Sequence, residues 1–186
     1  MVEPQAGDGT VVVTSASADA TRSLAARLGA EAAPGDVIAL RGDLGAGKTQ
    51  FAKGFARGLG VSAVVNSPSF TLMAEYAGRL PLFHLDLYRL AGAADAIAGG
   101  LLDERQQSGA TLIEWAERLD GPVGGADLEV RFEGAGDEVR RLTLVARSSR
   151  GSRYVSAARS WRPPAAMAED PTTAEPATEG ATGGAA

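Results

Sequence analysis

The sequence contains no cysteine and no long apolar run, and each absence excludes a class of protein. Without cysteine, the 186-residue chain has no disulfide framework, no thiolate metal site and no cysteine nucleophile. No stretch approaches about 18 uninterrupted apolar residues, so the sequence predicts no transmembrane helix. Residues 1–5 have neither a basic start nor an apolar run, which argues against a signal peptide and predicts a cytoplasmic protein.

Lysine is also scarce, and the charged residues are unevenly distributed. Of 18 basic residues only Lys48 and Lys53 are lysines, so a site that requires a lysine has two candidates. The net charge of the chain is −5, but residues 163–186 contain four acids and no base, which leaves 18 basic and 19 acidic residues elsewhere. Residues 139–168 contain seven arginines and no acid. A basic segment therefore precedes an acidic C-terminal end.

Composition divides the chain into three parts. Residues 1–9 and 148–186 are poor in large apolar side chains, and such segments bury too little surface to offset the entropy lost on ordering. We therefore expect a flexible N-terminus at 1–9 and a disordered tail at 148–186, rich first in arginine and then in alanine, proline, glycine, threonine and acids. Residues 10–147 are expected to form one domain of ordinary size.

Within residues 10–147 the hydrophobic patterns alternate between strands and helices. Apolar or alternating runs predict strands at 10–13, 37–40, 70–76, 80–86, 110–113, 128–132 and 139–145. Amphipathic spacing predicts helices at about 17–28 and 48–59, and a poorer, Ala/Gly-rich helical stretch at 93–107. A short turn joins the third and fourth strands, which predicts an antiparallel hairpin. The expected fold class is α/β, with three layers and a mixed, partly antiparallel sheet.

A glycine loop lies between the apolar strand at 37–40 and the helix at 48–59. Its eight residues from Gly42 to Thr49 match the phosphate-binding pattern G-x-x-x-x-G-K-[ST] at every required position. The glycines let consecutive backbone N–H groups converge on a phosphate chain, and the helix dipole points at the same anion. Lys48 supplies a mobile positive charge for the β- and γ-phosphates, and the Thr49 hydroxyl supplies a hard oxygen for Mg²⁺. The flanking strand and helix favour this interpretation over a chance match at a tight turn. We therefore expect the α/β domain to have a P-loop NTPase-like three-layer fold.

Two acids end apolar strands and are candidates for organising Mg²⁺. Asp86 follows Leu-Phe-His-Leu, and Glu114 follows Thr-Leu-Ile. A P-loop enzyme needs an acid at a strand end, so a metal role is favoured for Asp86 over a turn or helix cap. Glu114 could contact magnesium directly or through water, or orient the attacking water. The alternative is a surface acid at the start of a helix.

Three further features have a functional and a structural interpretation. Residues 66–71 form a hydroxyl-rich loop, which can sense the γ-phosphate in a nucleotide switch, although its composition alone favours a simple connector. His84, the only histidine, fits a strand side chain better than a catalytic base. Trp115 fits a partly buried anchor better than a base-stacking platform.

Two absent motifs narrow the nucleotide and the activity. The sequence has no guanine-specific [NT]-K-x-D segment, which disfavours GTP. Asp86 is followed by Leu87 instead of the glutamate of motor-type ATPases. We therefore expect residues 10–147 to be a P-loop ATPase domain that hydrolyses ATP slowly or when activated by a partner.

Four motifs, in this order and spacing, resemble the bacterial tRNA threonylcarbamoyladenosine biosynthesis ATPase family (TsaE, formerly YjeE). They are the glycine loop at 42–49, Ser-Pro-Ser-Phe-Thr-Leu at 67–72 with Glu-Tyr at 75–76, His-Leu-Asp-Leu-Tyr-Arg-Leu at 84–90, and Ile-Glu-Trp at 113–115. The resemblance covers about residues 10–147. It departs from the family at Ser69, where threonine is usual, and at 91–100, where the family tends to carry an acidic helix.

The resemblance implies a function and a set of site residues. It implies a P-loop ATPase, with ATP and Mg²⁺ as cofactors, that supports a TsaB–TsaD-like partner complex in installing threonylcarbamoyl on adenosine 37 of ANN-decoding tRNAs. The phosphates are then held by Leu44, Gly45, Ala46, Gly47, Lys48 and Thr49. Mg²⁺ is surrounded by Thr49, Asp86 and Glu114. The catalytic set is Lys48, Asp86, Glu114 and Thr71, the last in a switch-like loop at 67–71. A weaker match places Ser17 or Asp19 near the base.

Other functions remain open from the sequence. A small-molecule kinase would need an acceptor pocket and an arginine-bearing lid, yet residues 91–107 hold only Arg105. A nucleotide-gated binding module without relevant hydrolysis is the second alternative. We expect tRNA to be bound indirectly, through the partners. The seven arginines at 139–168 offer a direct phosphate contact, and the alternative is a solvated basic segment neutralised by the acidic tail.

Overall fold

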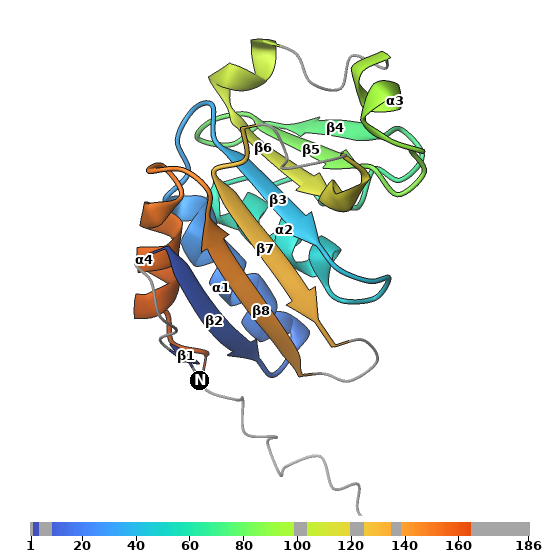
Figure 1. Cartoon of the computed structure of the whole chain (residues 1–186). Helices are drawn as coiled ribbons and strands as arrows, with labels where there is room; N and C mark the ends of the chain where they lie inside the picture. Colours follow the sequence, from blue (N-terminus) through green and yellow to red (C-terminus); the bar gives the residue numbers. More distant parts are fainter. Residues whose placement is uncertain (1, 4–8, 99–103, 120–124, 135–138, 165–186) are drawn as a thin grey trace, which may run out of the picture.

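The molecule is built on one mixed β-sheet; the structure, a computed structural model, describes residues 2–3, 9–98, 104–119, 125–134 and 139–164 (Figure 1). In these residues eight strands form a sheet of order β1-β2-β8-β7-β3-β6-β5-β4. Their bounds are β1 Val2–Glu3, β2 Thr10–Ser15, β3 Val37–Arg41, β4 Met73–Tyr76, β5 Leu82–Asp86, β6 Ala110–Glu114, β7 Leu128–Glu133 and β8 Arg140–Ala146. β7, β3, β6 and β5 are parallel, and the other neighbouring pairs are antiparallel. The predicted α/β class with a mixed sheet is confirmed.

Helices cover one face of this sheet, and shorter segments cover part of the other. The elements are α1 Ala18–Ala30, α2 Lys48–Gly58, α3 Ala93–Ala98 and α4 Ser152–Ser160, with 3₁₀ turns η1 Glu104–Ser108 and η2 Ala116–Arg118. In Figure 1, α1 and α2 lie behind the sheet, and the near faces of β2, β8 and β7 carry no helix. Among the helices of the described residues, none has the length and apolar character needed to cross a bilayer.

Two hydrophobic clusters, one on each face, hold the layers together. The larger cluster lies between the sheet and the long helices, where Leu24 of α1, Phe55 of α2 and Ile38 of β3 are fully buried. Burying side chains of this size contributes roughly 1.5–3 kcal/mol each. The smaller cluster joins Phe83 of β5 to Ala116 of η2 on the opposite face. Among the described residues, this cluster includes no side chain of β2, β8 or β7.

Two glycines of α2 let α1 pack against it at close range. A Cβ at Gly54 would lie 2.2 Å from the carbonyl oxygen of Arg22, and one at Gly58 would lie 2.1 Å from that of Ala26. A side chain at either position would force the helices apart, because real Cβ contacts are never this short. Since α2 begins at Lys48, this packing also fixes the end of the glycine loop.

Regular structure continues past residue 148, contrary to the prediction of a disordered tail from that point. Tyr154 and Val155 of α4 are fully buried in the larger cluster. Asp36, buried just before β3, accepts hydrogen bonds from the Tyr154 hydroxyl at 2.5 Å, from Arg150 at 2.7 Å and from Arg153. The prediction was wrong here because a distant buried acid neutralises the arginines of a segment that looks too polar on its own. Residues 165–186 lie outside the described residues.

Three other elements differ from the sequence prediction. The strand predicted at 70–76 begins only at Met73, because the backbone of Leu72 is left-handed, with φ 64°. The helical stretch predicted at 93–107 consists of α3 and η1, and residues 99–103 between them lie outside the described residues. Within the N-terminus expected to be flexible, residues 2–3 pair with β2 as β1, and residues 4–8 are not described.

Candidate nucleotide-binding site

The glycine loop leaves the carboxyl end of β3 and enters the first turn of α2, as its sequence predicts. Gly42, Gly45 and Gly47 have positive φ values of 143°, 79° and 106°, which residues with a side chain rarely adopt. Gly42 also passes close to β7, where a Cβ would lie 2.8 Å from the carbonyl oxygen of Phe132. Gly47 is the N-cap of α2. The unpaired N–H groups of the first helical turn therefore face the space above the loop, where an anion is favoured.

A cavity of about 440 Å³ lies at this place, within the range of small-ligand sites. Its lining comes from the glycine loop, the loop before β4 and the ends of β5 and β6: Leu44, Gly45, Ala46, Gly47, Lys48, Thr49, Gln50, Ser67, Ser69, Asp86, Tyr88, Arg89, Glu114 and Trp115. The structure thus brings together every predicted phosphate-binding and metal-binding residue. Of the predicted catalytic residues, Thr71 does not line the cavity, and its side chain is exposed.

Lys48 is buried at the wall of this cavity. Its Nζ donates hydrogen bonds to the carbonyl oxygens of Gly42 and Asp43, the latter at 2.9 Å. The ammonium group also lies over the ring of Trp115, 3.6 Å from its centroid. Burial lowers the pKa of Lys48, and the negative charges of Glu117 and Glu114 oppose this effect.

The two predicted acids stand side by side at one edge of the sheet. Asp86 and Glu114 are the last residues of parallel neighbours β5 and β6, and their Cα atoms are register partners. Both are almost completely buried, 3% and 2% exposed. The Thr49 hydroxyl of α2 donates to Glu114 Oε2 at 3.0 Å. One hydroxyl and two carboxylates at a phosphate-binding loop are the hard oxygen donors that Mg²⁺ prefers, so these residues fit that ion.

Asp86 is already occupied by three donors. Its Oδ2 accepts hydrogen bonds from the hydroxyls of Ser67 and of Ser69, the latter at 2.6 Å. Its Oδ1 accepts the backbone N–H of Tyr88 at 2.9 Å. The hydroxyl loop predicted at 66–71 is therefore tied to the acid at the end of β5. A simple connector would not make these contacts.

Two residues with side chains adopt left-handed backbone conformations beside the acids. Trp115, with φ 59°, follows Glu114 directly. Leu72, with φ 64°, accepts a backbone hydrogen bond from Asp86 at 3.0 Å. Each such conformation costs of order 1–3 kcal/mol and concentrates at functional sites. Both flank the same pair of carboxylates.

The chain is similar to proteins of one known family. The family model for "Threonylcarbamoyl adenosine biosynthesis protein TsaE" matches residues 15–142. The chain belongs to the TsaE family. It is 43% identical to the tRNA threonylcarbamoyladenosine biosynthesis protein TsaE of Bacillus subtilis, over 70% of this chain and 82% of that protein. It is 37% identical to that of Haemophilus influenzae, over 65% of this chain and 77% of that protein.

A solved structure is similar to this chain as well. The crystal structure of YdiB from Bacillus subtilis is similar at a TM-score of 0.61 and 36% identity, over 86% of this chain and 96% of that one. TsaE proteins form a P-loop ATPase family of tRNA threonylcarbamoyladenosine biosynthesis. The resemblance drawn from the four motifs is thus confirmed, and so is the P-loop fold.

Several residues in the site of this TsaE family member were missed by the sequence reasoning. Tyr88 packs its ring 4.9 Å from that of Trp115, and Gln50 binds Arg22 of α1. The Arg140 side chain borders the glycine loop, since a Cβ at Gly47 would lie 3.3 Å from its Nε. Tyr88 could have been predicted, because it belongs to the motif at 84–90 that contains Asp86. Arg140 could not, because only the order of strands in the sheet places it beside the glycine loop.

The seven arginines at 139–168 do not act as one basic segment. Arg150 and Arg153 are bound to the buried Asp36, and Arg159 donates to the carbonyl oxygen of Thr10. Arg141 and Arg147 instead lie on β8 and just after it, on the sheet face without long helices. A direct contact with RNA can therefore involve only part of this set.

Proposed function

We propose that the protein binds and slowly hydrolyses ATP in the cytoplasm, as an accessory to threonylcarbamoylation of adenosine 37 in ANN-decoding tRNAs. Its action is on a TsaB–TsaD-like partner complex. The observation that carries this proposal is the meeting of the glycine loop with Thr49, Asp86 and Glu114 around one cavity. Family membership supplies the pathway.

The phosphates of ATP would be held by Leu44, Gly45, Ala46, Gly47, Lys48 and Thr49. The positive-φ glycines turn backbone N–H groups toward the cavity, and the dipole of α2 adds to their attraction for an anion. Lys48 is buried beside this loop, so a phosphate oxygen can replace its present contacts with the carbonyl oxygens of Gly42 and Asp43.

Mg²⁺ would be held by Thr49 and Glu114 directly and by Asp86 through water. Thr49 and Glu114 already place two oxygens 3.0 Å apart, whereas Asp86 has its oxygens engaged by Ser67, Ser69 and Tyr88. Mg²⁺ commonly keeps several waters and one or two carboxylates in nucleotide sites. When bound, it neutralises charge on the phosphates. Asp86 then orients water and links the ion to the hydroxyl loop.

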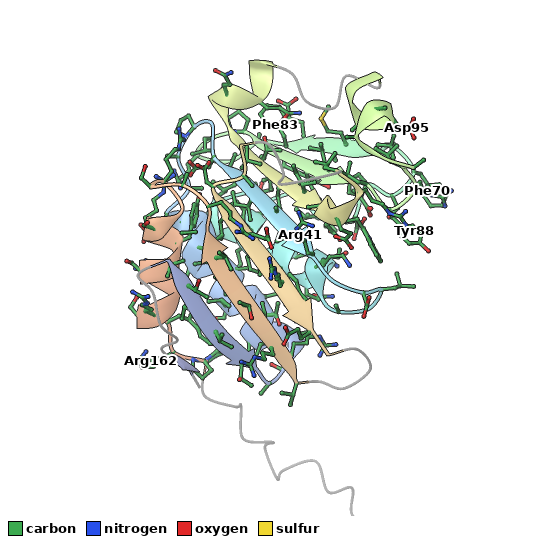
Figure 2. The ribbon with its side chains drawn as sticks, viewed as in Figure 1. Arg41, Phe70, Phe83, Tyr88, Asp95 and Arg162 are labelled. Atoms are coloured by element: carbon green, nitrogen blue, oxygen red, sulfur yellow. The ribbon has the colours of Figure 1, made fainter. Side chains whose placement is uncertain are left out.

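The hydroxyl loop would couple the nucleotide to the partner complex. Ser67 and Ser69 contact Asp86. Phe70 is 85% exposed (Figure 2), and the Arg89 guanidinium lies over its ring, 4.3 Å from the centroid. Leu44 on the glycine loop is 71% exposed. Exposed aromatic and arginine side chains beside a buried site are typical of protein interfaces. Thr71 as a catalytic residue remains a proposal that requires this loop to move.

Direct contact with tRNA is a second part of the proposal, and the arginines on the sheet face opposite α1 and α2 support it. Arg41, Arg131, Arg141 and Arg147 share that face in the described part of the chain. Glu129 and Glu133 are the acids paired with them, so positive charge is in excess. Phosphate binding here would weaken steeply with salt. Replacing Arg131 and Arg141 by glutamine should flatten the salt dependence of tRNA affinity, and Arg27→Gln on α1 should not.

A reconstituted modification assay tests the main proposal. The wild-type chain with the partner proteins, tRNA and ATP should support many rounds of modification, and a non-hydrolysable ATP analogue should not. Equal support by the analogue would favour a nucleotide-gated binding module. Transfer of the γ-phosphate to a metabolite instead of water would favour a kinase. Modification independent of this chain would overturn the proposal.

A further inference from the structure

His84 lies directly beneath the two acids of the site. It is two residues before Asp86 on β5, and its register partner on β6 is Leu112, two residues before Glu114. Since side chains alternate along a strand, His84 is on the same sheet face as Asp86 and Glu114. Its side chain is fully buried. The mechanism proposed above does not use it.

The imidazole holds one oxygen of Glu114. His84 Nε2 lies 2.9 Å from Glu114 Oε1, and Thr49 Oγ1 donates to the other oxygen, Oε2, at 3.0 Å. The carboxylate is therefore fixed at both ends, from β5 on one side and from α2 on the other. A carboxylate bound at both oxygens cannot rotate about its terminal bond without losing a buried hydrogen bond.

Both ring nitrogens indicate the same tautomer. An ionised carboxylate only accepts hydrogen bonds, so Nε2 must carry the proton that it shares with Glu114. Nδ1 is buried, and no group in the described part of the chain pairs with it. A proton on Nδ1 would be an unpaired buried N–H, which is costlier than a bare lone pair. The geometry thus selects the Nε2–H form.

We propose that His84 is a positioning residue that sets the orientation of Glu114 for Mg²⁺. The proposal deepens the proposed function, because it rests on Glu114 as a ligand of that ion. Groups that fix a metal ligand from behind typically change metal affinity or activity by about 10- to 100-fold when removed. Without His84, the carboxylate would keep its charge and lose its fixed direction.

The first test reads the tautomer without any ligand. His84 is the only histidine of the chain, so the untagged, ¹⁵N-labelled full chain gives a single imidazole in long-range ¹H–¹⁵N spectra. We expect a protonated Nε2 and a bare Nδ1. A protonated Nδ1 with a bare Nε2 would overturn the proposal, because Nε2 could then donate nothing to Glu114.

The second test separates positioning from folding. Calorimetry with a non-hydrolysable ATP analogue is repeated at stepped Mg²⁺ concentrations and in EDTA. In His84→Leu we expect the Mg²⁺ concentration for half-maximal tightening to rise about 10- to 100-fold, with unchanged affinity in EDTA. His84→Gln, which offers a side-chain N–H at a similar reach, should restore most of the loss. Leu82→Val, on the same face of β5, is the matched core control and should behave as wild type.

The other outcomes of the His84→Leu calorimetry would contradict a positioning role. An unchanged Mg²⁺ dependence in His84→Leu, or an equal loss of affinity with and without Mg²⁺, would show a purely structural histidine. Neither measurement uses tRNA or the partner proteins. Failure of the modification assay would therefore overturn the proposed function and leave the assignment of His84 standing.

Discussion

The Nζ of Lys48 lies 3.6 Å from the centroid of the Trp115 ring. Trp115, which directly follows the last residue of β6, thus covers the lysine of the glycine loop. Burial lowers the pKa of Lys48, against the opposing charges of Glu117, Glu114, Asp86 and Asp43. A desolvated ammonium group over an aromatic face gains roughly 2 kcal/mol from that contact. Lys48 is therefore buried and positioned at the cavity wall before any phosphate binds.

Lys48→Ala should abolish ATP turnover. The variant removes the only lysine that lines the cavity, and losing a preorganised charge of this kind lowers turnover by about 100-fold or more. The chain offers a matched control in Lys53, its only other lysine, which lies on the same helix outside that cavity. Phosphate release should be near wild type in Lys53→Ala. Comparable losses in both variants would contradict the assignment.

The left-handed backbone of Trp115 predicts an unusual order of stability. At φ 59° glycine is less strained than alanine by about 1 kcal/mol. Trp115→Gly should therefore be more stable than Trp115→Ala by about that amount in urea unfolding. In the interior of α2 the order should reverse, with Lys53→Gly about 1 kcal/mol less stable than Lys53→Ala. If Trp115→Ala were instead more stable than Trp115→Gly, as expected at position 53, Trp115 would carry no backbone strain.

The part of the site that the sequence predicted depends on local chemistry. Lys48 and Thr49 follow from a contiguous pattern, and Asp86 and Glu114 from apolar strands that each end in an acid. Naming these four candidates needed no knowledge of which strand neighbours which. The two acids meet because β5 and β6 are parallel neighbours, whose carboxyl ends lie at one edge of the sheet.

The part that escaped depends on partners far apart in the chain. His84 reads as an ordinary strand residue until register places it beside Glu114. The segment around Arg150 and Arg153 reads as solvated until Asp36 is known to be buried beneath it. A buried charge is stable only with such a partner. No local pattern specifies that partner, so α4 could not be predicted from composition.

Asp36→Asn should reduce stability in a pH-dependent way. Burial raises the pKa of Asp36, but hydrogen bonds from Arg153, Tyr154 and Arg150 outweigh it, and the net pKa is lowered. A lowered pKa stabilises the fold above the unfolded value near 3.9, and this contribution is lost as pH falls through the folded value. Urea unfolding should show Asp36→Asn less stable than wild type by about 2 kcal/mol at pH 7.

The difference between wild type and Asp36→Asn should then shrink as the pH falls below about 4. Glu133→Gln is the control, because the Glu133 side chain is 62% exposed and its ion pair with Arg141 is long, at 3.7 Å. Its stability should stay within about 0.5 kcal/mol of wild type. A gap that widens toward acid pH would mean that the folded pKa of Asp36 is raised instead.

Two truncations should distinguish the contribution of α4 to the free energy of unfolding from that of the residues after Pro164. Ending the chain after Arg147 removes Arg150, Arg153 and Tyr154, so that Asp36 keeps the backbone N–H of Ala33 and loses its side-chain donors. Losing the charged partners of a buried acid costs about 3–5 kcal/mol. Ending it after Pro164 keeps all of these contacts and should change the free energy of unfolding by less than about 0.5 kcal/mol. Equal stability of both truncations would show that α4 does not belong to the folded domain.

The hydroxyl loop offers a test of which side chain acts on the nucleotide. Ser67 and Ser69 hold Asp86, whereas Thr71 is exposed and outside the cavity lining. Removing both serine hydroxyls should lower basal ATP turnover by about tenfold, because Asp86 loses two of the donors that orient it. Thr71→Val should lower it less. A larger loss in Thr71→Val would show that the loop carries Thr71 into the cavity during turnover. The contacts of Ser67 and Ser69 with Asp86 would then belong to a resting arrangement that ATP replaces.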